Sequence, residues 1–165
     1  MTNDTNTFLN DCDAQMDHYS SKGLVTHLAR QRKGASNLTY RFKWHMGRFF
    51  DLVADSKNKK LTFSCLLPGV DKKSVIDADI RAFIKSQTGP DIAEHRRLAE
   101  DPKNVRLINR KGSISLSVAA ENDNASVLVE RMIGIGHQVY TQFLRKGGYD
   151  EYLVEVFDID LDTYM

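Results

Sequence analysis

The stretch LTYRFKWHMGRFFDLVADSKNKKLTFSCLL, residues 38 to 67, decides the fold. Apolar side chains recur in it at every second residue, which is typical of strands with one buried and one exposed face. The connections at Gly47 and at residues 56–60 are short, so we expect an antiparallel meander. The pattern predicts three strands, at Leu38 to Met46, Arg48 to Ala54 and Leu61 to Leu67.

The first of these strands carries aromatic and basic side chains in alternation. Tyr40, Phe42 and Trp44 lie on one face, whereas Arg41, Lys43 and His45 lie on the other. A surface that stacks single-stranded RNA needs aromatic rings and cations on the same accessible face. We therefore expect the aromatic face in the core, with Trp44 near its centre. Nucleic-acid binding is not the favoured reading, and binding of RNA or another polyanion through the basic segment 22–60 remains the alternative.

Helical periodicity surrounds this meander. Val, Ile and Phe residues at helical spacing predict an amphipathic helix that begins after Asp71, and two glycines end a later one. The predicted elements outside the meander are helices at 10–32, 75–87 and 125–146, a short helical piece at 91–100, a hairpin of 104–109 with 113–120, and a strand at 152–157.

The order of elements predicts an α+β protein with two layers. Helix, three strands, helix, two strands and helix follow one another, with no alternation of single strands and helices that would indicate a parallel sheet. We expect an antiparallel sheet with the helices packed on one face, and a single domain over 1–165. Residues 1–9 are expected to be disordered, and 149–165 to form an acidic C-terminal strand or tail.

Charge is distributed unevenly along a chain whose net charge is only +1. Residues 22–60 hold ten Lys and Arg against two Asp, and residues 150–165 hold six acidic residues and no basic one. Such asymmetry indicates either a basic patch for an acidic partner or acidic ends that fold back on the basic strands. The sequence leaves both possibilities open.

Motifs of catalysis and of metal or cofactor binding are missing from the sequence. Two distant cysteines give neither a disulfide framework nor a zinc site, and the five histidines lack paired ligand spacing. GIGHQV, Gly134 to Val139, lacks the third glycine of a dinucleotide loop and lies in a helical pattern, so its glycines should instead admit a close neighbour. We expect a protein that is not an enzyme, with no cofactor and no metal. The sequence shows neither a secretory signal nor a membrane span, which predicts a cytoplasmic location.

The second half, NVRLINRKGSISLSVAAENDNASVLVERM (residues 104–132), completes an element order that resembles the type III secretion chaperone-like fold. That fold includes YbjN-type proteins, described as sensory transduction regulators. The resemblance covers about residues 10 to 146 and rests on the order and length of the elements. It implies a small dimeric protein without enzymatic activity that binds an extended segment of another protein along its sheet and helices.

The function predicted from the sequence is therefore protein association, chaperone-like or regulatory, in a homodimer. An open sheet can accept an added strand through backbone hydrogen bonds, and apolar surface beside it supplies side-chain pockets. The predicted partner surface consists of the basic side chains of the first strands and the hydroxyl face of the hairpin. Its members are Arg41, Lys43, His45, Arg48, Ser113, Ser115 and Ser117.

Overall fold

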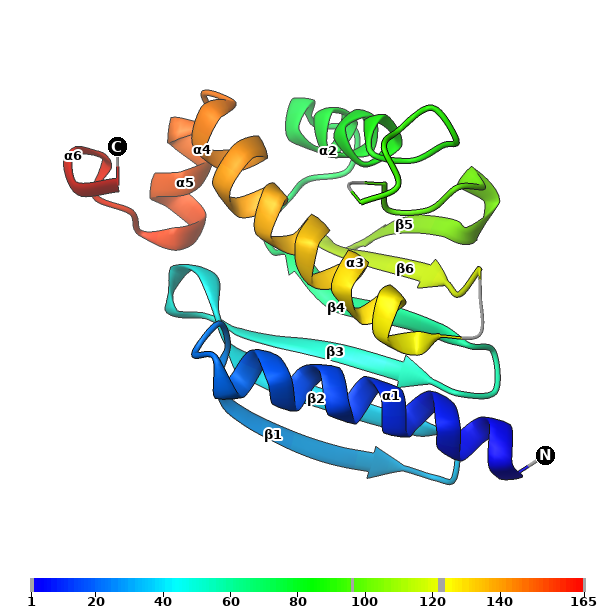
Figure 1. Ribbon diagram of the computed structural model, residues 1–165. Coiled ribbons are helices and arrows are strands. Elements are labelled where there is room, and N and C mark those ends of the chain that lie inside the picture. Colours follow the sequence, from blue (N-terminus) through cyan, green and yellow to red (C-terminus); the bar gives the residue numbers. More distant parts are fainter. Residues whose placement is uncertain (1, 96, 122–123, 165) are drawn as a thin grey trace.

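The computed structural model describes residues 2–95, 97–121 and 124–164, and the fold is α+β as predicted. Its strands form one antiparallel six-stranded sheet in the order β1-β2-β3-β4-β6-β5 (Figure 1). The strands are β1 (Thr26–Lys33), β2 (Asn37–Lys43), β3 (Phe49–Asp55), β4 (Lys60–Leu67), β5 (Val105–Arg110) and β6 (Ser113–Ala119). The helices are α1 (Thr2–Ser21), α2 (Val75–Ser86), α3 (Ala125–Gln138), α4 (Leu144–Lys146), α5 (Asp150–Phe157) and α6 (Leu161–Tyr164).

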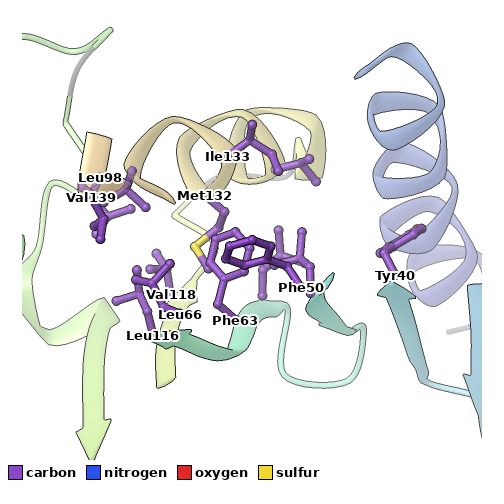
Figure 2. Packing of buried hydrophobic residues seen from close by; sticks show 14 of the residues in the cluster. Tyr40, Phe50, Phe63, Leu66, Leu98, Leu116, Val118, Met132, Ile133 and Val139 are labelled. Carbon is purple, nitrogen blue, oxygen red and sulfur yellow. The ribbon is translucent and has the colours of Figure 1, made fainter. Parts of the chain in front are cut away.

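One face of the sheet, called here the helix face, carries the core. Figure 1 shows α1 and α3 crossing this face, and Figure 2 shows Phe50 and Phe63 of the sheet lying against Met132 of α3. All three side chains are buried. Each strand of the meander contributes alternate residues to this face, because successive side chains point to opposite sides of a strand.

Helix α1 is fixed to the first two strands by a polar junction at the rim of the core. The buried Tyr40 hydroxyl donates to Asp13 Oδ1 at 2.6 Å. Arg30 of β1 donates to Asp13 at 3.0 Å and to Asp17, so one cation of the sheet pairs with two carboxylates of α1. Burial and the hydrogen bond to Asp13 raise the pKa of Tyr40. The acidic start of the chain therefore neutralises part of the basic segment on the helix face.

The first helix ends earlier than the sequence predicts. Gly23, with φ of 74°, lies in the left-handed region that ends helices, and residues 26–33 continue as strand β1 rather than as helix. Strand β1 is mostly exposed on both faces, so it lacks the alternation that marks a strand. Residues 2–9, expected to be disordered, belong to α1, and Phe8 and Leu9 are buried.

Three other expectations are corrected by the structure. The predicted strand at 152–157 is part of helix α5, in which the neighbours Tyr152 and Leu153 are both buried, as on one side of a helix. Segment 91–100 contains turns and bends instead of a helical piece in its described residues. Trp44 is half-buried at the edge of the core, because β2 ends at Lys43.

Helix α3 holds two glycines with opposite surroundings. A methyl group built on Gly136 would lie 2.8 Å from the Trp44 ring, so this glycine admits a close neighbour, as predicted. A methyl group on Gly134 would meet no atom within 4 Å among the described residues. The Trp44 ring stacks on Phe63 and contacts Phe50, which leaves it little room to move.

We predict that Gly134→Ala stabilises the protein by about 1 kcal/mol, because alanine favours a helix interior over glycine by that amount. Gly136→Ala should instead destabilise it by about 1–2 kcal/mol, since overpacking against Trp44 outweighs the same helical gain. Urea denaturation of the two variants checks both values. Equal effects of the two substitutions would contradict the packing described for Trp44.

Candidate functional site

The face of the sheet opposite the helices, called here the open face, is left to solvent by the described part of the chain. Arg41 of β2 and Ser115 and Ser117 of β6 lie on it, and the Arg41 side chain is 60% exposed. Two hydroxyl bonds link its strands, from Ser115 to the Ser64 carbonyl at 2.5 Å and between Ser117 and Thr62 at 2.9 Å. These two hydrogen bonds connect β6 to β4 across the open face.

An exposed aromatic ring lies at the basic end of the open face. Phe49, at the start of β3, is 45% exposed, and the Arg41 guanidinium lies 5.1 Å from the centre of its ring. Lys43 is opposite Phe49 in the β2–β3 register. The acidic C-terminal helix α5 does not cover this region, because Tyr152 of α5 bonds to the Pro68 carbonyl at 2.6 Å instead. Cations and one aromatic ring thus share an accessible face, which the sequence did not predict.

Two of the predicted partner-binding residues, His45 and Arg48, lie away from the open face. The turn after β2 contains Met46 with φ of 59°, and this turn directs both side chains toward α3. Arg48 donates to the Tyr140 hydroxyl and to the Leu66 carbonyl at 3.5 Å, and stacks over Phe50 at 4.7 Å. Arg48 therefore connects the sheet to Tyr140, which lies just after the end of α3.

His45 lies at the same junction between the turn after β2 and the end of α3. Its ring is parallel to that of Tyr140 at 5.3 Å, and its Nε2 lies 3.2 Å from Nδ1 of His137. Burial, and then the charge of His137, lower the pKa of His45 to about 4. Burial raises the pKa of Tyr140, although the nearby Arg48 lowers it. The His45 ring is therefore neutral near pH 7, in agreement with its packing against the Tyr140 ring.

The outer strand β5 borders an apolar groove. A pocket of about 250 Å³ lies between α2 and β5, with Ile84, Val105 and Leu107 as its apolar lining and Arg81 and Lys85 as its basic lining. Val105 and Leu107 are only half-buried, because no described strand lies beyond β5. We call this pocket, together with the outer side of β5 that faces away from β6, the β5 groove.

Hydrogen bonding shows which backbone groups of β5 face outward. The Leu107 carbonyl accepts from Arg81 Nη1 at 3.1 Å, so it points away from the neighbouring strand β6. Within an antiparallel strand the N–H and C=O of one residue point to the same side. The Leu107 amide therefore also faces the groove. Arg81 is held in place by Asp77, at 3.3 Å from Nε to Oδ2.

The opposite edge strand, β1, is less suited to pairing. Its register with β2 is interrupted between Thr26 and Ala29, and His27 there has φ of 55°. Arg30 points toward α1 and its two aspartates. A bulge and inward-facing charges are common devices that keep an edge strand from pairing. Of the two edges, β5 is the better template for an added strand.

A second pocket, of about 240 Å³, lies between α3 and segment 94–98. Arg97 and Arg131 line it together with Glu94 and Glu130, and Gly134 lies at its floor. Arg97 Nε is buried and has no hydrogen-bond partner among the described residues. Arg131 is paired with Glu121 at 3.4 Å. The lining of this pocket therefore carries charges of both signs.

The described residues contain neither a cluster of metal ligands nor a helix that could span a membrane. No group of three or more His, Cys, Asp or Glu residues within 2–95, 97–121 and 124–164 could hold a metal ion. In the same residues no helix has the length and apolar character needed to cross a membrane.

Comparisons of the chain with protein-family models, curated proteins and solved structures give no match. The resemblance to the type III secretion chaperone-like fold therefore stays a prediction.

The structure brings five of the seven predicted partner-binding residues to one face. These are Arg41, Lys43, Ser113, Ser115 and Ser117. The β5 groove was missed, because α2 and β5 are far apart in sequence and neither has an unusual pattern. The sequence contains the alternation of Arg106, Ile108 and Arg110 with Val105 and Leu107, but it does not show that α2 lies beside this strand.

The different roles of Arg48 and Arg41 give a testable prediction. Arg48→Met should lower the free energy of unfolding by roughly 2 kcal/mol, because it leaves buried acceptors without their charged donor. Arg41→Met should change it by less than about 0.5 kcal/mol, as expected for an exposed residue in a surface ion pair. Chemical denaturation measures both. Similar small effects would show that Arg48 does not connect the sheet to α3.

Proposed function

We propose that this protein is a non-enzymatic protein-binding module, chaperone-like or regulatory, that adds an extended segment of a partner to strand β5. The single observation that carries the proposal is the β5 groove, where an outward-facing backbone lies beside a preformed apolar pocket. Added strands gain affinity from main-chain hydrogen bonds and specificity from alternate side chains.

The side chains around β5 define what kind of segment fits. Val105 and Leu107 face the groove, so the residues of an added strand on that side should be apolar. Arg106 and Arg110 lie on the open face of β5, opposite Ser117 and Ser113 of β6. Cross-strand neighbours of opposite charge stabilise a sheet. A segment that alternates apolar and acidic residues is therefore the best complement.

Charge around the groove favours the same segment. Arg81 and Lys85 line the pocket, and the carboxylate nearest to them, Asp77, is already paired with Arg81 and hydrogen-bonded to Asn109 at 3.0 Å. The hydrogen bond from Asn109, and then the hydrogen bond and charge of Arg81, lower the pKa of Asp77, so this carboxylate is ionised and already bound by groups of its own chain. Net positive charge remains to attract an acidic partner.

The proposal predicts that peptides selected from a library of extended segments bind the full-length protein and alternate apolar with acidic residues. Leu107→Lys should weaken their binding by roughly tenfold or more, because it places a charge in the apolar pocket at the centre of the contact. Fluorescence anisotropy measures the affinities.

Val53→Lys is the matched control, since Val53 is equally half-buried but lies on the open face of β3. It should leave the peptide affinity unchanged, and circular dichroism verifies that both variants fold. A selection that enriches no peptide, or peptides equally sensitive to both substitutions, would refute binding at β5.

A second candidate function is binding of RNA or another polyanion at the basic end of the open face, and the exposed ring of Phe49 beside Arg41 favours it. Arg41→Glu with Lys43→Glu should then abolish binding of single-stranded oligonucleotides at low salt, and Phe49→Ala should weaken it. A wild-type protein that binds no oligonucleotide at low ionic strength eliminates this candidate. Gel-shift titrations over several salt concentrations give the answer.

A further inference from the structure

We propose that the natural occupant of the β5 groove is the acidic C-terminal segment of a second copy of this chain, residues 157–162. This inference rests on the proposed function, because it names the segment that the groove accepts. The argument joins the sequence of the tail to the pattern of side chains around β5.

The tail has the alternation that the groove requires. Its sequence FDIDLD places Phe157, Ile159 and Leu161 on one parity and three aspartates on the other. In an extended strand the apolar set would face one side and the aspartates the opposite side. Beside β5, the apolar set would enter the pocket at Val105 and Leu107, and the carboxylates would lie beside Arg106 and Arg110.

Binding to a second copy requires the tail to leave its present position. It departs from helix α5 at Asp158, which has φ of 52° and ends the helix. Beyond it, Ile159 keeps one backbone bond, to the Leu153 carbonyl at 3.3 Å. Asp160 is exposed, and Ile159 and Leu161 are only half-buried. To extend these residues, helix α6 has to unwind, and Phe157 at the end of α5 has to leave its ring contacts with Tyr140 and Tyr152.

The occupant has to be a second copy rather than the same chain. Figure 1 shows α6 and the C-terminus at the end of the molecule beyond α5, far from the start of β5 and the loop that precedes it. Five residues span at most about 18 Å when fully extended. A direct pairing of two β5 strands, in contrast, would bring the basic side chains of both copies together, which charge repulsion disfavours.

The test measures self-association of the full-length protein by sedimentation equilibrium across a wide range of concentrations. Replacing Asp158, Asp160 and Asp162 together by Asn keeps the shape of the tail and removes its charge. We expect this triple variant and Leu107→Lys each to weaken association at least roughly tenfold, and added salt to weaken the wild-type association.

The matched control replaces Asp150, Glu151 and Glu155 of helix α5 by their amides, which removes the same charge from a segment outside the tail. It should leave the association constant unchanged. Addition of the synthetic peptide FDIDLDTYM should dissociate the wild-type oligomer, whereas the peptide FNINLNTYM should not.

The result that overturns the inference is a monomer at all concentrations that does not bind FDIDLDTYM. If library peptides nevertheless bind in a Leu107-dependent way, the groove functions as proposed but its occupant is another protein. If neither the tail peptide nor library peptides bind, the proposed function itself is wrong. An oligomer that is indifferent to the tail and to Leu107→Lys also refutes the inference.

Discussion

The packing of α1 and α3 on one face of the sheet is the constraint on which the rest of the structure depends. Tyr40 bonded to Asp13 fixes α1, and Phe50 and Phe63 pack under α3. Both helices are used on this face, so the open face and the outer side of β5 are left for other molecules. The hydrogen bond from Arg48 to the Tyr140 hydroxyl holds the turn after β2 against the end of α3. It belongs to the scaffold, and the surfaces available to partners lie elsewhere.

The sequence predicted the strands that have one buried face and missed the one that does not. In β2, β3 and β6, and in β4 as far as Ser64, burial alternates with the residue number, so period-two patterns identify them. Strand β1 is exposed on both sides, and only its pairing with β2 makes it a strand. At 152–157 the same pattern wrongly predicted a strand, because apolar residues of both parities occur there. In helix α5 the neighbours Tyr152 and Leu153 are instead both buried on one side.

The candidate site was predictable only in part, for related reasons. Parity placed Arg41, Lys43 and the three serines on one face correctly. The alternation no longer predicts the side-chain direction beyond Lys43. Met46, with its left-handed backbone, reverses the direction of the chain there, and the Arg48 side chain points inward. The groove depends on how α2 lies against β5, a tertiary relation that no local pattern contains.

Hydrogen exchange of the full-length protein, with and without a bound acidic–apolar peptide, tests the central claim most directly. The account predicts that protection appears at the amide of Leu107 and its neighbours in β5, while amides of β1 and of the open-face residues around Phe49 exchange as before. Protection centred on β2 and β3, or spread evenly over the sheet with β5 unchanged, would contradict the claim that β5 is the binding edge.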